Sequence, residues 1–172
     1  MKIEKLDHVH IYVKDIDAAM KSFQTLTGSE FRDWGGRKVQ DFTREFGCVA
    51  AFHPLGLELV QVTDQTQSKA STVGGKGGLP DETWREGVAC LSFRVESLAD
   101  SLAELEAAGW QIVFYSEVGK MKDATVRFPG IDQLLIELTQ YEGASVPEAT
   151  EQANDEAGHA EGSLRSVSER AS

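Results

Sequence analysis

The sequence has little cysteine and no long hydrophobic run. Its 172 residues include 2 cysteines, Cys48 and Cys90, which form neither a CxxC motif nor a disulfide framework. A reduced, cytoplasmic setting is therefore expected. No apolar stretch approaches the roughly 18 residues of a membrane-spanning helix, and the N-terminus lacks the apolar core of a signal peptide. We expect a soluble protein without a membrane partner.

Basic residues are also scarce. Lys and Arg together number 17 against 28 Asp and Glu, which gives a net charge of -11. Such a balance opposes phosphate backbones and anionic lipid surfaces. We therefore expect no nucleic-acid partner.

Aromatic residues are absent from the last part of the chain, residues 142–172, which is rich in Ala, Glu, Ser and Gly. This composition offers too little apolar surface to offset the entropy of ordering the chain. We predict a folded domain over residues 1–141 and a disordered acidic tail over 142–172.

What the chain does contain is one pattern of strands and a helix that occurs twice. The first copy begins with a strand over residues 5–13, in which His8 and His10 fall on one face and the aliphatic residues on the other. A helix follows, with Asp15 or Asp17 as its N-cap and Gly28 at its end. The further extended segments of this copy lie at 30–34, 46–52 and 57–62.

The second copy starts at Gly87 and repeats this order. Its expected elements are strands at 88–95, 110–115, 124–128 and 134–141 and a helix from Leu98 to Gly109. His8 aligns with Cys90, and Glu58 in Leu57-Glu58-Leu59 aligns with Glu137 in Ile136-Glu137-Leu138. We infer an internal duplication of a βαβββ module, spanning about 5–63 and 87–141 and joined by a glycine-rich linker at 64–86.

Two such modules predict an α+β fold in which their sheets join into one curved, half-open mixed β-barrel. Strand alternation places His8, Glu58 and Glu137 on its inner face. A carboxylate inside a barrel is unfavourable unless it is paired or bound to a metal. Imidazoles and carboxylates around a concave site suit a divalent Zn, Fe, Mn, Co or Ni ion.

Three stretches of the chain, residues 7–19 with Gly28, 87–95 and 135–138, resemble the vicinal oxygen chelate superfamily. This superfamily includes glyoxalase I, methylmalonyl-CoA epimerase, extradiol dioxygenases and bleomycin-resistance proteins, and the likeness covers about residues 5–141. It implies four metal ligands on the first and last strands of the two modules.

By position, the ligands that the resemblance implies are His8, Glu58, residue 90 and Glu137. Residue 90 departs from the pattern, because Cys90 stands where related isomerases commonly have His. Three alternatives stay open: Cys90 binds as a thiolate, His10 supplies the fourth ligand, or the metal is lost and only the cavity remains.

The resemblance also implies a reaction. A metal-dependent lyase or isomerase of the glyoxalase or epimerase type would act on a small oxygenated metabolite through a stabilised enolate, with Glu58 or Glu137 as the base. One alternative is a ring-cleaving Fe(II) dioxygenase that uses His8, His10 and Glu137. The other is a metal-free binding protein of the bleomycin-resistance type. A homodimer is compatible with each.

Overall fold

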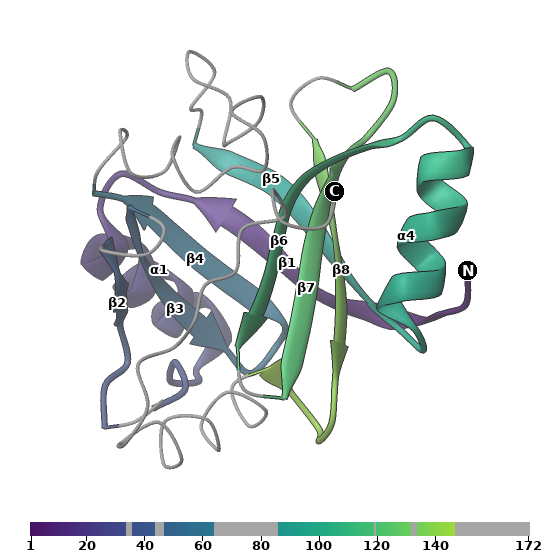
Figure 1. The fold of residues 1–172 in the computed structure, drawn as a ribbon. Coiled ribbons are helices and arrows are strands. Elements are labelled where there is room, and N and C mark those ends of the chain that lie inside the picture. The colour runs from purple at the N-terminus through teal and green to yellow at the C-terminus, as the bar shows by residue number, and fades with distance from the viewer. Residues whose placement is uncertain (34–35, 44–46, 64–85, 119, 132–133, 147–172) are drawn as a thin grey trace.

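One curved eight-stranded sheet carries the fold, with a helix on the outside of each half (Figure 1). The computed structural model describes residues 1–33, 36–43, 47–63, 86–118, 120–131 and 134–146. The elements in chain order are β1 (Ile3–Tyr12), α1 (Ile16–Thr27), β2 (Gln40–Phe42), β3 (Cys48–His53), β4 (Leu57–Val62), β5 (Gly87–Val95), α4 (Leu98–Ala107), β6 (Gln111–Val118), β7 (Met121–Arg127) and β8 (Leu135–Tyr141).

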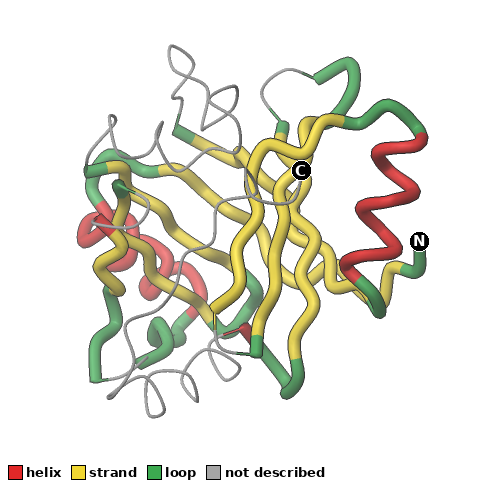
Figure 2. The backbone as a smooth tube through the Cα atoms, viewed as in Figure 1, coloured by secondary structure: helices red, strands yellow, loops and turns green. Residues whose placement is uncertain are grey.

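The strand order shows that the two halves are related by a pseudo-twofold axis. The order is β2-β3-β4-β1-β5-β8-β7-β6, so the same arrangement is read from either edge toward the centre. The central strands β1 and β5 run antiparallel to each other, whereas β1 pairs with β4 and β5 with β8 in parallel. Figure 2 shows the strands curling around one concave face. The predicted fold, two βαβββ modules in a half-open mixed barrel, is confirmed.

The helices begin in the same way in both halves. The Asp15 side chain accepts a hydrogen bond from the Ala18 amide, and Ser97 accepts one from the Asp100 amide. The first helical amide of each helix also donates to a glutamine of the last strand of the same half, Ile16 to Gln61 and Leu98 to Gln140, at 2.9 and 2.8 Å. These repeated contacts lock each helix to the strand that carries Glu58 or Glu137.

The apolar core lies between each helix and the outer face of its half of the sheet. In the first half it is formed by Ile16, Met20, Phe31, Ala51 and Leu59. In the second half it is formed by Val95, Leu98, Leu105, Ala124, Val126, Ile136 and Leu138. Because alternate residues of a strand point to opposite faces, the histidines and glutamates lie on the concave face, which also carries smaller apolar clusters such as Tyr12, Ala50 and Val60.

Two expected strands differ in position from the structure. Residues 30–33 form no strand, because Phe31 is inserted in the core at 2 % exposure and the Arg32 amide donates to the carbonyl of Phe52. The edge strand of the first half is β2 instead. In the second half, β7 begins at Met121, three residues before the predicted strand start at Ala124.

The predicted linker and tail lie mostly outside the described residues. Of the linker 64–86 only Glu86 is described, and of the tail 142–172 only residues 142–146. Within that short part, Val146 is buried against Phe52 and Tyr141. The ordered domain therefore continues past β8.

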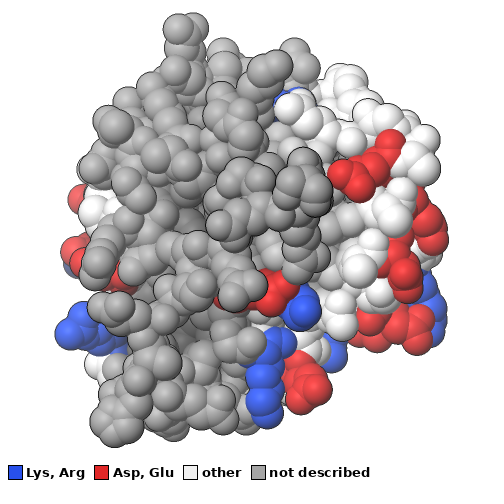
Figure 3. All heavy atoms as spheres, viewed as in Figure 1, with Lys and Arg blue, Asp and Glu red and all other residues white. Residues whose placement is uncertain are grey.

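Charge is distributed unevenly over the surface. Acidic side chains gather on the side of the molecule that carries α4 (Figure 3), and this helix exposes Asp100, Glu104 and Glu106. No helix in the described part of the chain is long and apolar enough to span a membrane.

Gly56, in the turn between β3 and β4, lies against the backbone of β1. It has a φ of 77°, and a Cβ built on it would approach the carbonyl oxygen of Asp7 to 3.0 Å. Its own carbonyl accepts a hydrogen bond from the Val9 amide at 2.9 Å. The turn thus fixes the part of β1 that carries His8.

We predict that Gly56→Ala destabilises the protein by more than Gly28→Ala. Both glycines have positive φ, so both substitutions should lower the free energy of unfolding by about 1 kcal/mol through backbone strain. A Cβ at Gly28 meets nothing within 4 Å, so only Gly56→Ala adds a clash with β1. Urea unfolding of the two variants measures the difference, and equal losses would contradict the role assigned to the turn.

Candidate metal centre

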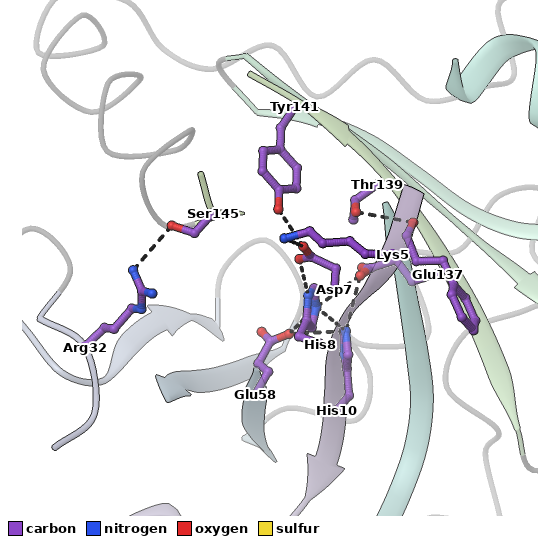
Figure 4. A network of polar contacts seen from close by, with 11 residues as sticks. Lys5, Asp7, His8, His10, Arg32, Glu58, Glu137, Thr139, Tyr141 and Ser145 are labelled. Atoms are coloured by element: carbon purple, nitrogen blue, oxygen red, sulfur yellow. Dashed lines mark hydrogen bonds and ion pairs between the residues drawn. The ribbon is translucent and has the colours of Figure 1, made fainter. Parts of the chain in front are cut away.

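Four ionisable side chains meet on the concave face at the seam between the halves (Figure 4). His8 and His10 come from β1, Glu58 from β4 and Glu137 from β8. The Nε2 atoms of the two histidines are 2.9 Å apart. Each of these nitrogens lies 3.2–3.3 Å from Oε2 of Glu58 and from Oε2 of Glu137. The structure therefore brings three predicted ligands together and adds His10 to them.

The register of the sheet explains this convergence. His10 pairs directly with Glu58 on β4, and His8 is separated from Glu137 on β8 only by Ser92 of β5. Residues paired across neighbouring strands point to the same face of a sheet. The four side chains therefore lie in two adjacent rows on the concave face.

The Asp7 carboxylate contacts Nδ1 of His8, the ring nitrogen away from the glutamates. A β-bulge brings these two neighbouring side chains together. Leu6 pairs with Phe93 and His8 with the next residue of β5, so Asp7 is an extra residue in β1. Its Oδ2 lies 2.9 Å from Nδ1 of His8. Its Oδ1 accepts a hydrogen bond from the Tyr141 hydroxyl at 2.5 Å and lies 2.8 Å from Nζ of Lys5.

The second half contains the equivalent bulge. In β5, Val88 pairs with Ile11 and Cys90 with His10, so Ala89 is the extra residue there. In the alignment of the two halves, Ala89 corresponds to Asp7 and Cys90 to His8. The backbone repeats, but the carboxylate and the imidazole occur only in the first half.

The charges of the cluster compensate one another. Burial lowers the pKa of His8, but hydrogen bonds to Asp7, Glu137 and Glu58 outweigh burial and raise it well above its usual value. Burial also lowers the pKa of His10, and the charges of Glu58 and Glu137 reverse this to a net rise. The pKa of Glu137 is raised by burial but falls well below its usual value because of His10 and His8. Positive charge on the imidazoles and negative charge on Glu137 therefore stabilise each other in the metal-free site.

Cys90 pairs with His10 across β1 and β5 and lies on the same face, but it is not among the ligand atoms that come together. It is buried at 3 % exposure and packs with Val113 and Leu135. Burial, followed by the charges of Glu137 and Glu58, raises the pKa of its thiol well above the usual value. A thiolate is the ligating form of cysteine, so this environment disfavours Cys90 as a ligand. Geometry favours the alternative in which His10 is the fourth member.

Asp123 is a further buried carboxyl group on the concave face of the second half. It is 4 % exposed, pairs across the sheet with Thr139, and accepts a hydrogen bond from the Ser116 hydroxyl. Burial and then the charge of Glu137 raise its pKa well above the usual value, which keeps the group protonated more readily than an exposed aspartate.

Sequence reasoning missed Asp7, Tyr141 and Asp123 as parts of this network. Asp7 belongs to the face opposite His8 under strict alternation, and only the bulge brings the two together. Asp123 fell outside the strand expected at 124–128. A detectable signal was the alternation of polar Asp123 and Thr125 with Ala124 and Val126, which extends that strand toward its start.

The residues present fit a divalent cation. Two imidazole nitrogens and two carboxylate oxygens are donors that Zn, Fe, Mn, Co and Ni ions accept. The ligand atoms of His8, His10 and Glu137 all lie within 4.8 Å of one another. The contact between Asp7 and Nδ1 of His8 is the outer-shell arrangement that orients a metal-binding imidazole.

A duplicated half-barrel with imidazoles and carboxylates at its seam defines a class of small metal-site and ligand-binding proteins. Comparison of the sequence with protein families places it within that class. The chain belongs to the glyoxalase/bleomycin resistance protein/dioxygenase superfamily, whose sequence model matches residues 7–128. No curated protein matches the sequence.

Solved structures with this fold include methylmalonyl-CoA epimerases. A variant of the Streptomyces coelicolor enzyme in complex with 2-nitronate-propionyl-CoA has a TM-score of 0.61 and 16% identity, over 83% of this chain and 100% of that one. The Mycobacterium tuberculosis enzyme has a TM-score of 0.60 and 18% identity, over 82% and 90%. A hypothetical protein from Bacillus halodurans has a TM-score of 0.60 and 18% identity, over 82% and 96%.

We predict that Asp123→Asn stabilises the metal-free protein increasingly as the pH rises. The folded pKa of Asp123 lies above its unfolded value of about 3.9, so its contribution to stability is present at low pH and is lost as the pH rises through the folded pKa. Asparagine can still accept the hydrogen bond from Ser116 and does not titrate. The gap between variant and wild type in urea unfolding should therefore widen from pH 4 to pH 8.

The matched control is Asp17→Asn, in the exposed first turn of α1. Its difference from wild type should not grow in the same direction. A gap for Asp123→Asn that stays constant over this pH range would show that folding does not raise the pKa of this carboxyl group.

Proposed function

We propose that this protein is a metal-dependent isomerase of the epimerase type, which removes and returns a proton at a carbon next to a carbonyl group. The observation that carries the proposal is the placement of Glu58 and Glu137. Their Oε2 atoms each lie 3.2–3.3 Å from the same two histidine nitrogens, on strands from opposite halves of the sheet. Inverting a carbon centre requires proton acceptors and donors on both of its faces, and two such carboxylates supply them.

In this proposal His8, His10, Glu58 and Glu137 hold the cation. A divalent ion bound there supplies Lewis acidity, which polarises a substrate carbonyl and makes the neighbouring C–H group more acidic. Asp7 holds Nδ1 of His8, so that Nε2 of the same ring faces the site. Tyr141 and Lys5 in turn fix the Asp7 carboxylate.

The two glutamates divide the proton transfers between them. Glu137 acts as a carboxylate that accepts the proton; in the metal-free site its burial raises its pKa, but His10 and His8 hold it well below the usual value. Glu58, on the other side of the histidine pair, acts on the opposite face of the substrate carbon. Each has one carboxylate oxygen next to the histidines, and exchange between its two oxygens moves the proton-accepting atom toward the substrate.

A small acyl compound with an acidic C–H group is the substrate class that suits this chemistry. Structural neighbours of the same fold are complexes with 2-nitronate-propionyl-CoA and with methylmalonyl-CoA. These neighbours support acyl-CoA thioesters as the first compounds to test.

A ring-cleaving dioxygenase is the second candidate, because His8, His10 and Glu137 form a cluster of two histidines and one carboxylate. Iron sites of this kind leave coordination positions open for oxygen and substrate. Here Oε2 of Glu58 lies 3.3 Å from Nε2 of His8 and 3.2 Å from Nε2 of His10. This second carboxylate favours the isomerase.

We predict that the wild type binds one Co²⁺ or Zn²⁺ ion per chain with an affinity that increases between pH 6 and pH 8. The raised pKa values of His8 and His10 mean that metal must displace protons, so binding tightens as the pH rises. Competition with a chromogenic chelator measures the affinity at each pH. His10→Ala should weaken binding at least about 10-fold, as the loss of a ligand does.

Cys90→Ala is the matched variant for the same titration, since the alignment places Cys90 at the conventional ligand position. It should leave the affinity within about twofold of wild type, because Cys90 packs with Val113 and Leu135. The opposite ranking would make the cysteine the fourth ligand. If the wild type binds no stoichiometric metal, the isomerase proposal fails and the metal-free binding protein becomes the favoured function.

The reaction itself is tested by proton exchange. Metal-loaded protein incubated with methylmalonyl-CoA in D₂O should incorporate deuterium at the carbon between the two carbonyl groups, as followed by mass spectrometry. Glu137→Gln and Glu58→Gln should each slow exchange by about 100-fold or more, because each removes one proton acceptor. Oxygen consumption with catechol by the iron-loaded protein, without exchange in the first assay, would favour the dioxygenase instead.

A further inference from the structure

The Ser92 side chain lies between two members of the candidate metal centre. In the sheet register Ser92 pairs with His8 on one side and with Glu137 on the other. The Cα atoms of directly paired residues are about 4.5–5.5 Å apart, and their side chains leave the sheet on the same face. The Ser92 hydroxyl is therefore part of the same row as Nε2 of His8 and the Glu137 carboxylate.

This hydroxyl is buried and unpaired. Ser92 has 0% exposure, and its Oγ has no hydrogen-bond partner among the residues that the structure describes. Other buried serines do have partners: Ser101 donates to the Ser97 carbonyl at 2.7 Å, and Ser116 donates to Asp123. Because a buried polar group without a partner destabilises the folded state, alanine would suit the fold better than serine at this position.

The pseudo-twofold symmetry relates Ser92 to a residue of the candidate metal centre. His10 is next to Glu58 in the parallel pair β1–β4, and Ser92 is next to Glu137 in the parallel pair β5–β8. Ser92 is thus the counterpart of His10. The first half fills this place with a histidine that contacts both glutamates, whereas the second half fills it with a short hydroxyl side chain that contacts neither through a hydrogen bond.

We propose that Ser92 is a substrate-binding residue, whose hydroxyl donates a hydrogen bond to an oxygen atom of the substrate held beside His8 and Glu137. This inference rests on the proposed function, since it takes the centre to hold a cation and an oxygenated substrate. The substrate oxygen is one that bears negative charge or gains it during the reaction, because a hydroxyl donor stabilises that charge. Ser92 thereby acts from β5, between His8 of β1 and Glu137 of β8.

The proposal predicts opposite effects of Ser92→Ala on stability and on ligand binding. In the metal-free protein the variant should unfold at an equal or higher urea concentration than wild type, because it removes an unsatisfied polar group. A structural role, for example with a permanently bound water as partner, predicts a loss of stability instead. Ser101→Ala, which removes a satisfied buried hydroxyl outside the site, is the matched control and should lower stability.

Ligand binding is measured with acetohydroxamate, a small anion with two neighbouring oxygen atoms, added to Co²⁺-loaded protein. The visible spectrum of Co²⁺ reports both metal and probe binding. Ser92→Ala should leave the Co²⁺ affinity within about twofold of wild type and weaken acetohydroxamate binding about 5- to 10-fold, the effect of losing one hydrogen bond. Ser101→Ala should change neither.

Each other outcome is decisive. Unchanged acetohydroxamate binding in Ser92→Ala, or a fall in Co²⁺ affinity as large as the fall in probe affinity, overturns the substrate-binding role. A loss of stability equal to that of Ser101→Ala overturns it as well. A wild type that does not bind Co²⁺ refutes the proposed function itself and the role of Ser92 with it, a result distinct from a variant that binds metal and probe normally.

Discussion

The structure depends on mutual compensation of charge among His8, His10, Glu58 and Glu137 at the seam. None of these side chains is more than 15% exposed. A buried ion without a partner is unfavourable by several kcal/mol. Each imidazole nitrogen therefore lies near both carboxylates, and these contacts join side chains of β1, β4 and β8 across the sheet. A cation in this place would compensate the two carboxylates in place of imidazole protons.

Much of this organisation follows from patterns that a sequence displays. Alternation over β1 places His8 and His10 on the inner face, and the repeat of Leu-Glu-Leu as Ile-Glu-Leu places Glu58 and Glu137 there. These patterns have a period of two residues, so they determine the face on which a side chain lies. They do not determine distances along that face. Whether His10 or Cys90 completes the cluster depends on such distances and required the structure.

Departures from regular alternation explain why Asp7 and Asp123 were not predicted from the sequence. The bulge at Asp7 adds one residue to β1 and brings its carboxylate to the side of His8, which no periodic pattern predicts. Asp123 was hidden because an aspartate at the start of an apolar run is typical of a turn. Its burial is tolerated because Ser116 donates a hydrogen bond to it and the carboxyl can remain protonated.

The second bulge, at Ala89, carries a consequence for how such proteins diverge. Here the β5 backbone repeats the irregularity that presents the Asp7–His8 pair on β1, although the side chains are a methyl group and a thiol. Two substitutions, Ala89→Asp and Cys90→His, would give β5 the same pair of side chains as Asp7 and His8. The β5 backbone is thus already suited to an Asp–His pair. Point mutations alone would therefore place metal ligands in the second half, without insertion, deletion or rearrangement of the sheet.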